Sequence, residues 1–565
     1  MRFAVIADSH FHPAEGPTDA AWPSDALFNP RNAAAVAMVR QAKPAFVVHL
    51  GDVPHPVPGL ATHLGALGMA RATYADLGVP LLVVPGNHDV GDKPHPWAPA
   101  PSVTAEKHAT FREWWGAPWW VIERDGVRLV GIDTPIVNSG IALEAEQWAW
   151  LESVFVAPGR AALPTFVFLH YPPYLLTADE PEHYDNLAEP GRTRLLDLFV
   201  RARVQAVFCG HVHHPFWNQH RGVDFYLLPS PAFVRPGYSE LGRVGPGDEF
   251  GRNDADRLGF CIVHVEPTGA GHRIEWVHTS TPDPVPPGGP APDCPLGLTL
   301  RHAWDAVLDI PADGLDPFRR KQARNDLVLF ASWELGVTLL RLPFEDLRRP
   351  ATRERLLALR HRGQRAVLYT AERLSEADLA LVDEHRDAIV AVEFIVPRLW
   401  LDRPLPNVAV PRWVAAFGRH ATEEGRYFSH FAPHGFLPGD PDLSRVGGEG
   451  ILFRIDPGTD PAAGIAAARE AGSALGKAIA ALILLPRGGE GVAFTDDAAI
   501  TARVTAAFRA ARAYPDVTVV LDTTMDHDRG YFPRHGLIDR RGNPRPAFRE
   551  LVRLSKAGAD DDFSR

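Results

Sequence analysis

Five short blocks in the first half of this 565-residue chain carry side chains that bind divalent metal ions. The blocks are DSH (8–10), GD (51–52), GNHD (86–89), HYPP (170–173) and GHVH (210–213). Carboxylate, amide and imidazole groups together suit Zn, Mn, Fe or Co ions. We count two aspartates, one asparagine and four histidines of these blocks as ligands. Seven ligands are too many for one tetrahedral ion, so the pattern predicts a site for two ions.

Each block directly follows an apolar run that we expect to form a β-strand. Most runs are continuous rather than alternating, as expected for strands covered on both faces in an α/β sheet. Open α/β sheets bind ligands beyond the carboxyl ends of their strands, where residues distant in sequence converge. Glycines beside positions 52, 87 and 211 would let the backbone turn sharply there. The expected strands are 3–7, 45–50, 80–85, 127–133, 165–170 and 205–210.

At these blocks the sequence resembles the calcineurin-like metallophosphoesterase family, whose pattern is D-x-H, G-D, G-N-H-D/E, H and G-H-x-H in that order. The resemblance covers roughly residues 1–280 and implies a four-layer α/β-β/α sandwich. The D-x-H-F start and the compact block spacing are similar to the class III cyclic-nucleotide and glycerophosphodiester phosphodiesterases.

The resemblance also implies the ligands of two divalent ions, which would be Mn, Fe, Zn or Co. The ligands of one ion would be Asp8, His10 and His213. Those of the other would be Asn87, His170 and His211. Asp52 would bridge both ions.

His88 would face the phosphate together with Asn87, and would stabilise charge or protonate the leaving oxygen. Asp89 would orient His88. Tyr171 departs from the family, because many relatives carry a second His at this position.

The implied chemistry is hydrolysis by in-line attack of a hydroxide that bridges the two ions. Two ions, two aspartates and one hydroxide leave about one net positive charge to attract a phosphate oxyanion. A general acid typically adds about 10² to 10⁴ in rate, and His88 is the candidate.

Residues that flank the blocks could complete the pocket. These are His12, His55, His214 and Tyr238. The segments 11–31, 91–108 and 234–258 could roof the site, and Arg235, Arg243 and Arg252 of the last segment could contact a substrate.

The second half of the chain follows a linker rich in Pro and Gly. We expect a phosphoesterase domain at 1–280, a linker at 281–297, a barrel domain at 298–556 and a disordered tail at 557–565. Eight strand candidates indicate a (β/α)₈ barrel, TIM-like in fold. They are 327–332, 338–343, 366–371, 389–396, 427–433, 450–455, 481–486 and 517–524.

The segment 534–551 resembles the tail of glycoside-hydrolase-type barrels. Such enzymes need two carboxylates that flank the scissile bond. Glu393 lies inside the fourth candidate strand, but the seventh ends without an acid and Glu490 lies a few residues beyond it. The sequence therefore favours a barrel that binds, positions a substrate or stabilises the protein.

Composition narrows the remaining choices. A net charge of −11 disfavours an extended nucleic acid as partner, because such binding neutralises phosphates with Lys and Arg. The chain has no run of about 18 apolar residues, so we expect no membrane span. Cys209, Cys261 and Cys294 lack paired spacing, which predicts a reducing, cytoplasmic location.

These observations favour a phosphodiesterase with two metal ions that acts on a small diester, whose sugar or polyol part the barrel would help to recognise. One alternative is a phosphomonoesterase or nuclease of the same fold. Another is a carbohydrate-binding scaffold protein with a vestigial metal site, against which the intact ligand set argues.

Overall fold

The structure is a computed structural model that describes residues 1–15, 21–96, 98, 100–155, 163–242, 244–266, 271–281, 284–312, 316–418, 434–485, 496–526 and 536–557. The chain divides into two compact units. The first unit comprises 1–289 and 307–327, and the second comprises 290–306 and 328–565.

The first unit contains two sheets whose inner faces pack together. The five-stranded sheet has the order β11-β10-β1-β2-β3, with β1 (Arg2–Ile6), β2 (Val47–His49), β3 (Leu81–Val83), β10 (Gly259–Val265) and β11 (His272–His278). The six-stranded sheet has the order β4-β5-β6-β7-β9-β8, with β4 (Trp120–Arg124), β5 (Val127–Gly131), β6 (Thr165–Leu169), β7 (Ala206–Cys209), β8 (Phe216–His220) and β9 (Val223–Leu227). Phe3 joins the two sheets by edge-on contacts with Phe166 and Phe208, at 6.1 and 6.4 Å between ring centroids.

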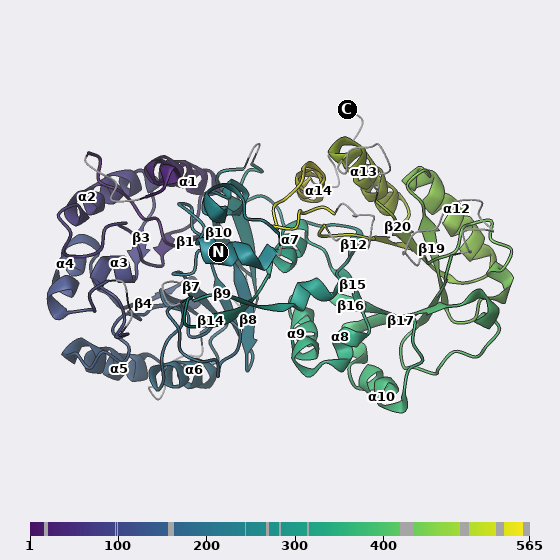
Figure 1. Cartoon of the computed structure of the whole chain (residues 1–565), viewed down its shortest axis with the longest axis horizontal. Helices are drawn as coiled ribbons and strands as arrows, with labels where there is room; N and C mark the ends of the chain where they lie inside the picture. Colours follow the sequence, from purple (N-terminus) through teal and green to yellow (C-terminus); the bar gives the residue numbers. More distant parts are fainter. Residues whose placement is uncertain are drawn as a thin grey trace. The chain divides into compact units, whose positions relative to one another are not determined.

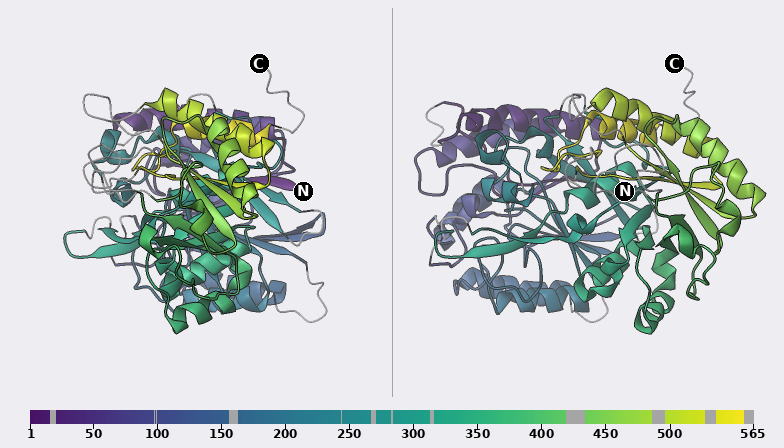
Figure 2. Two further views of the ribbon diagram at one scale, coloured as in Figure 1. Left: turned by 90° about the vertical axis from the view of Figure 1, so that its right-hand side faces the viewer. Right: turned by 45° about the vertical axis from the view of Figure 1, so that its right-hand side comes forward.

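Helices cover the outer face of each sheet. The apolar faces of α1 (Phe28–Ala42) and α2 (His63–Tyr74) share one core with the five-stranded sheet. Those of α5 (Ala142–Phe155) and α6 (Gly191–Arg201) share another with the six-stranded sheet. The helix, sheet, sheet, helix order is visible in Figures 1 and 2, and it is the α/β sandwich that the sequence predicted.

Strands β1, β2 and β3 run parallel, as do β5, β6, β7 and β9. The carboxyl ends of β1, β2, β3, β6 and β7 lead into the five blocks. The third block begins a single helical turn, α3 (Asn87–Val90), and α4 (Ala105–Trp115) follows it.

The second unit contains a closed barrel of eight parallel strands. In order they are β12 (Leu296–Thr299), β15 (Leu339–Pro343), β16 (Arg365–Thr370), β17 (Ile389–Val396), β18 (Arg412–Ala416), β19 (Gly450–Ile455), β20 (Ala478–Ile483) and β21 (Val517–Leu521). The helices of this half are α7 (Leu327–Leu335), α8 (Glu345–Arg348), α9 (Pro350–Arg360), α10 (Glu376–Glu384), α12 (Pro461–Ala474), α13 (Asp497–Ala513) and α14 (Pro546–Lys556).

Three expectations about this half need correction or comment. The segment 327–332 is helical, since it begins α7, and a short apolar run alone does not distinguish a buried helix from a strand. The sequence missed β12, which starts within the expected linker, and β18. The expected strand 427–433 and the tail beyond residue 557 lie outside the described residues.

A two-stranded hairpin departs from the order of the chain. Its strands β13 (Val307–Pro311) and β14 (Arg320–Arg324) follow β12 in sequence but belong to the first unit. Ile310 and Ala323 of the hairpin are buried in the core of the six-stranded sheet. Figure 1 labels β14 near β7 and β9.

None of the helices in the described residues is both long and apolar enough to cross a membrane.

Candidate metal centre

The carboxyl ends of five strands bring together the seven side chains that the blocks predicted as ligands. All seven side chains are buried, each at most 3% exposed. Those that follow β1, β2 and β3 are Asp8, His10, Asp52 and Asn87. Those that follow β6 and β7 are His170, His211 and His213.

Asp8, His10 and His213 form the first group. The Nε2 atoms of His10 and His213 lie 3.1 Å apart, and His213 Nε2 lies 3.4 Å from Asp8 Oδ1. One ligand atom from each residue lies within 4.8 Å of the others, so the group could hold a metal ion.

Asp52, Asn87, His170 and His211 form the second group. Asn87 Oδ1 lies 3.0 Å from His170 Nε2 and 3.1 Å from His211 Nδ1. His170 Nε2 lies 3.4 Å from Asp52 Oδ1. Ligand atoms of Asp52, His170 and His211 also lie within 4.8 Å of one another, so this group could hold an ion as well.

The carboxylate of Asp52 faces both groups. Its Oδ1 lies 3.4 Å from His170 Nε2, and its Oδ2 lies 3.7 Å from His10 Nε2. One oxygen is thus directed toward each group, which is the arrangement required of a bridging ligand.

These spacings fit a metal ion in each group. Bonds of about 2.0 to 2.1 Å at tetrahedral angles place neighbouring ligand atoms about 3.4 Å apart. Five of the distances between ligand atoms within the two groups lie between 3.0 and 3.4 Å.

Most of the histidines are held from behind by a second polar group, as metal-bound imidazoles usually are. His170 Nδ1 lies 2.8 Å from the Leu50 carbonyl oxygen, and His213 Nδ1 lies 3.1 Å from that of Phe233. His211 Nε2 lies 3.4 Å from Asp185 Oδ1. Sequence reasoning missed Asp185, because a single aspartate in a polar loop carries no motif.

The backbone at the site is strained. Non-glycine residues rarely adopt positive φ, and such conformations persist where the surrounding structure enforces them, often at functional sites. Five of the seven residues have φ between 48° and 69°. They are Asp8, His10, Asp52, His211 and His213.

Glycines make these close approaches feasible. Gly51 has φ of 93°, and a Cβ on it would lie 2.4 Å from the backbone nitrogen of Gly86. A Cβ on Gly86 would lie 2.3 Å from Asp52 Oδ1. The turns after β2 and β3 therefore pack so closely that neither glycine position leaves room for a Cβ atom.

The surroundings shift the pKa values of the ligand histidines in opposite directions. Burial by itself would lower the pKa of His170, but the Asp52 and Asp8 carboxylates outweigh it and raise that pKa to about 9. Burial lowers the pKa of His211 to about 3 and that of His10 well below its ordinary value.

His88 lies beside both groups. Its backbone N–H donates to Asp52 Oδ1 at 2.7 Å, and its ring meets that of His10 edge-on at 4.6 Å. Its Nδ1 contacts the His55 carbonyl oxygen, which leaves Nε2 as the atom available to a ligand.

The expected role of Asp89 needs correction. In the described part of the chain its carboxylate accepts backbone N–H groups from Asp52 at 2.7 Å, Gly86 at 2.8 Å and Val53 at 3.3 Å. Asp89 therefore does not orient the His88 ring. It holds together the two turns that carry Asp52 and Asn87.

Two of the flanking histidines lie beside the first group, and the third packs against Tyr238. His55 Nδ1 lies 3.3 Å from His10 Nδ1, and the ring of His12 lies 4.7 Å from that of His55. His214 instead stacks on Tyr238 at 5.4 Å. The Tyr238 hydroxyl donates to Asp185 Oδ2 at 2.8 Å, so Tyr238 acts behind the site.

The described arginines of segment 234–258 are engaged in ion pairs. Arg235 pairs with Asp185, and Arg252 donates two hydrogen bonds to Asp25 Oδ1 at 2.6 and 3.1 Å. Arg243 lies outside the described residues.

The barrel acid that the sequence singled out is not a free carboxylate. Glu393 is fully buried and accepts two hydrogen bonds from Arg341, at 2.7 and 2.6 Å. A carboxylate held in this way is poorly suited to donate a proton to a glycosidic oxygen. Glu490 lies outside the described residues.

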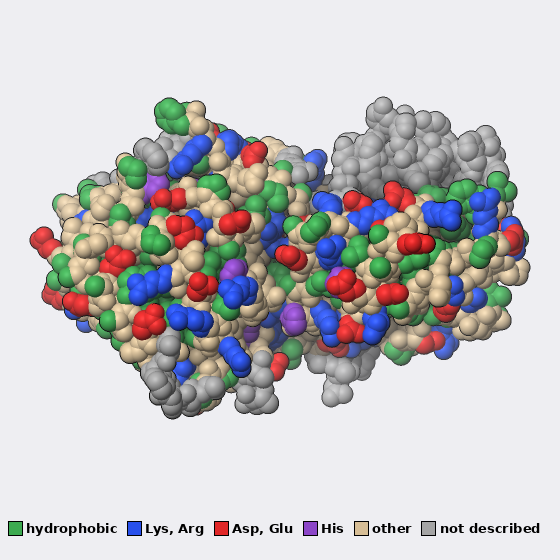
Figure 3. All heavy atoms as spheres, turned by 90° about the horizontal axis from the view of Figure 1, so that it is seen from below, with side chains coloured by type: hydrophobic (Ala, Val, Ile, Leu, Met, Phe, Trp, Pro, Cys, Tyr) green, Lys and Arg blue, Asp and Glu red, His purple; other side chains and the backbone are tan. Residues whose placement is uncertain are grey.

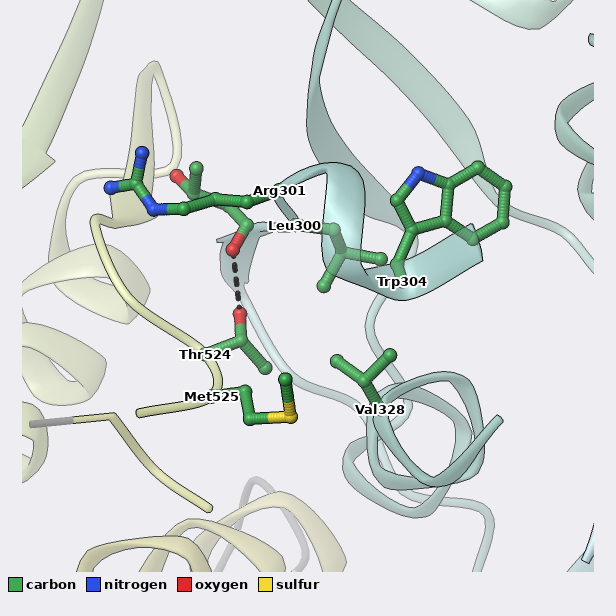
Figure 4. Close-up of a pocket in the computed structure, with 7 residues that line it drawn as sticks. Leu300, Arg301, Trp304, Val328, Thr524 and Met525 are labelled. Atoms are coloured by element: carbon green, nitrogen blue, oxygen red, sulfur yellow. Dashed lines mark hydrogen bonds between the residues drawn. The ribbon is translucent and has the colours of Figure 1, made fainter. Parts of the chain in front are cut away.

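Two hollows lie at the carboxyl ends of barrel strands. A cavity of about 20 Å³, the size of a single water, lies beside β12 and β21. Figure 4 shows Arg301 and Trp304 among its lining residues, with Thr524 Oγ1 donating to the Thr299 carbonyl at 3.0 Å. A larger groove of about 580 Å³ lies beyond β16 and β17 and includes the half-exposed Trp400.

Comparison with known proteins addresses the first unit. Residues 1–215 match the family model described as calcineurin-like phosphoesterase. "Serine/threonine-protein phosphatase CPPED1" of Bos taurus is 31% identical over 191 residues, which cover 33% of this chain and 58% of that protein. "Glycerophosphodiester phosphodiesterase GpdQ" of Enterobacter lignolyticus (strain SCF1) is 28% identical over 255 residues, which cover 42% of this chain and 79% of that protein.

Among solved structures, purple acid phosphatase PPD1 from yellow lupin aligns at a TM-score of 0.34 and 15% identity, over 50% of this chain and 52% of that one. The match to the CPPED1 relative spans 58% of the length of that protein.

Proposed function

We propose that this protein hydrolyses a small phosphodiester with the aid of two divalent metal ions, since residues 1–215 match the family model described as calcineurin-like phosphoesterase. The observation that carries the proposal is the carboxylate of Asp52, which directs one oxygen to each of two groups of ligand atoms. The ions would be Mn, Fe, Zn or Co, which share these ligand types.

We assign the seven converging side chains to the two ions. Asp8, His10 and His213 would hold the first ion. Asn87, His170 and His211 would hold the second, and Asp52 would contact both. When bound, such ions lower the pKa of water and neutralise the non-bridging oxygens of a phosphate.

His88 would serve the leaving group. Because His88 Nδ1 contacts the His55 carbonyl, Nε2 is the atom that would carry a proton toward the departing oxygen. Asn87 and His88 would also contact the phosphate. Their backbone positions are set by Asp89, which ties the third block to the second.

A diester is our preferred substrate class because the GpdQ relatives carry the name of a phosphodiesterase. The CPPED1 relatives are named phosphatases, so hydrolysis of a monoester is the second candidate. Nuclease activity is less favoured. On the face that Figure 3 draws, the coloured Lys and Arg side chains are interspersed with Asp and Glu, and this mixture does not support binding to the phosphates of a duplex.

For the second unit we propose a (β/α)₈ barrel domain over residues 298–556 that stabilises the protein or binds a sugar or polyol. The groove beyond β16 and β17 supports a binding role, since its volume suits a small ligand. The three cysteines are free and buried, which supports a cytoplasmic location.

The test compares bis(p-nitrophenyl) phosphate with p-nitrophenyl phosphate after the purified protein is stripped and reloaded with Mn²⁺. We expect the diester to be the better substrate by kcat/KM. The Asp52→Ala variant should keep its far-UV circular dichroism and lose hydrolysis. Turnover that survives chelation, or an active Asp52→Ala, would refute the proposal.

Glycerophosphodiesters, cyclic nucleotides and sugar phosphodiesters would then be screened with the same reloaded protein. Sugar binding that is insensitive to chelator and comes without turnover of any ester would instead support the scaffold alternative.

A further inference from the structure

Asp185 is a fully buried carboxylate directly behind a predicted metal ligand. Its Oδ1 lies 3.4 Å from His211 Nε2 and accepts a hydrogen bond from Arg235. Its Oδ2 accepts hydrogen bonds from the Tyr238 hydroxyl at 2.8 Å and from the Lys321 ammonium. Four groups thus fix the orientation of this one carboxylate.

Lys321 comes from the part of the chain that follows the first barrel strand. It lies on β14 of the hairpin, and its side chain is 3% exposed. The Lys321 ammonium also lies 4.7 Å above the centre of the Tyr238 ring. The hairpin therefore delivers a buried cation from a segment far downstream of the last metal-ligand block.

The hairpin is anchored in the first unit independently of this ion pair. Arg324 donates to the side chain of Asn218 at 2.5 Å, and the backbone N–H of Trp217 donates to Asp326 at 3.0 Å. The neighbours of Lys321 on β14 face solvent and include Gln322. The backbone of β14 is thus held in place even when the contact between Lys321 and Asp185 is removed.

The orientation of Asp185 matters for the state of His211. His211 Nδ1 faces Asn87 and His170, so this atom must keep its lone pair to bind an ion. The proton then sits on Nε2, and an acceptor on that side fixes the tautomer and the ring. If Oδ2 lost a donor, the carboxylate could turn and Oδ1 would leave Nε2.

We propose that Asp185 positions His211 for the second ion and that Lys321, supplied by the β13–β14 hairpin, holds Asp185 in the orientation this requires. The inference rests on the proposed function in one respect, namely that the site takes up two ions. Asp185 and Lys321 are positioning residues, because neither lies against the reacting atoms.

The test is a titration of metal-free, full-length protein with Co²⁺, followed by visible absorption and by calorimetry, without any substrate. We compare the wild type with Lys321→Met, and use Gln322→Met as the matched control on the opposite face of the same strand. Far-UV circular dichroism and thermal midpoints report folding. If Lys321→Met does not fold, Lys321→Gln carries the same test.

We expect Lys321→Met to weaken the second binding event by about 10- to 100-fold while the first is unchanged. Gln322→Met should behave as wild type, and Lys321→Arg should recover most of the loss. In an Asp185→Asn background, Lys321→Met should add less than about a twofold further change, because Lys321 acts through Asp185.

The inference would be overturned if Lys321→Met bound each of the two ions with the same affinity as the wild type. So would an undiminished effect of Lys321→Met in the Asp185→Asn background, which would make the role of Lys321 merely structural. A wild-type protein that binds a single ion would instead refute the two-ion proposal. All three outcomes are read from metal binding alone and do not depend on hydrolysis.

Discussion

Individual residues at the metal centre adopt conformations that are unfavourable without a cation. Asp8, His10 and Asp52 hold positive φ, which costs of the order of 1 to 3 kcal/mol at each such residue. The Nε2 atoms of His10 and His213 approach to 3.1 Å. An ion between such atoms would offset this cost, and for that reason we expect the site to bind metal tightly.

Replacing His88 with Ala separates ion binding from catalysis. We expect His88→Ala to retain both ions, since its side chain is not among the assigned ligands, and to lose about 10²- to 10⁴-fold in kcat. Metal content by elemental analysis and steady-state kinetics on bis(p-nitrophenyl) phosphate check this. Unchanged turnover, or a missing ion, would contradict the role assigned to His88.

Lys93 gives a prediction about pH and stability. Its ammonium donates to the carbonyls of His183 and Asn186, and burial lowers its pKa from 10.5 to about 8. Below pH 8 Lys93 is protonated in both the folded and the unfolded chain, so the folded state bears the full free-energy cost of burying its charge. Between pH 8 and 10.5 the unfolded chain binds more protons, and the free energy of unfolding rises by about 3 kcal/mol.

Lys93→Met removes this titration. The stability of wild type relative to Lys93→Met should therefore increase from pH 8 to pH 10.5 and stay constant from pH 6 to pH 7.5. Thermal midpoints of the two proteins across this range provide the measurement. A difference that does not vary with pH would show that Lys93 keeps an ordinary pKa.

Among the elements, the turns that follow β2 and β3 decide whether the ligands can meet. Asp89 binds backbone N–H groups of both turns, and glycines at 51 and 86 allow them to touch. Sequence patterns predicted these strands well, because each is a continuous apolar run that ends in a polar block. They failed at 327–332, where burial on all sides gives a helix the same composition as a strand.

Gly86→Ala tests the contact between these turns. Its Cβ would lie 2.3 Å from Asp52 Oδ1, so we expect loss of metal binding and a destabilisation of about 1 to 3 kcal/mol. Gly68→Ala is the matched control, because a Cβ there meets nothing within 4 Å and the residue lies inside α2. That variant should be equally or more stable. Normal Co²⁺ binding by Gly86→Ala would show that Asp52 can shift.

For the molecule as a whole, the assigned metal ligands and the barrel belong to different units. All seven assigned ligands lie in the first unit, whereas the eight barrel strands lie in the second. A ligand that binds only the folded state stabilises the unit that holds it.

Removal of metal should therefore lower the melting temperature of one unit alone. We expect two calorimetric transitions, of which chelation shifts one by several degrees and leaves the other in place. Readdition of Mn²⁺ should restore the shifted transition. If both transitions move equally, the units unfold together and the ions stabilise the whole chain.

The sequence by itself determined which residue types stand at strand ends, and from these the seven ligand candidates, the sandwich fold and the phosphoesterase family could be predicted. Such features are local, since an apolar run and the polar block after it are adjacent in the chain. Only the tertiary structure decided what lies behind the ligands. Asp185, Lys321 and the true partners of Asp89 carry no motif, because their roles depend on contacts between residues far apart in the chain.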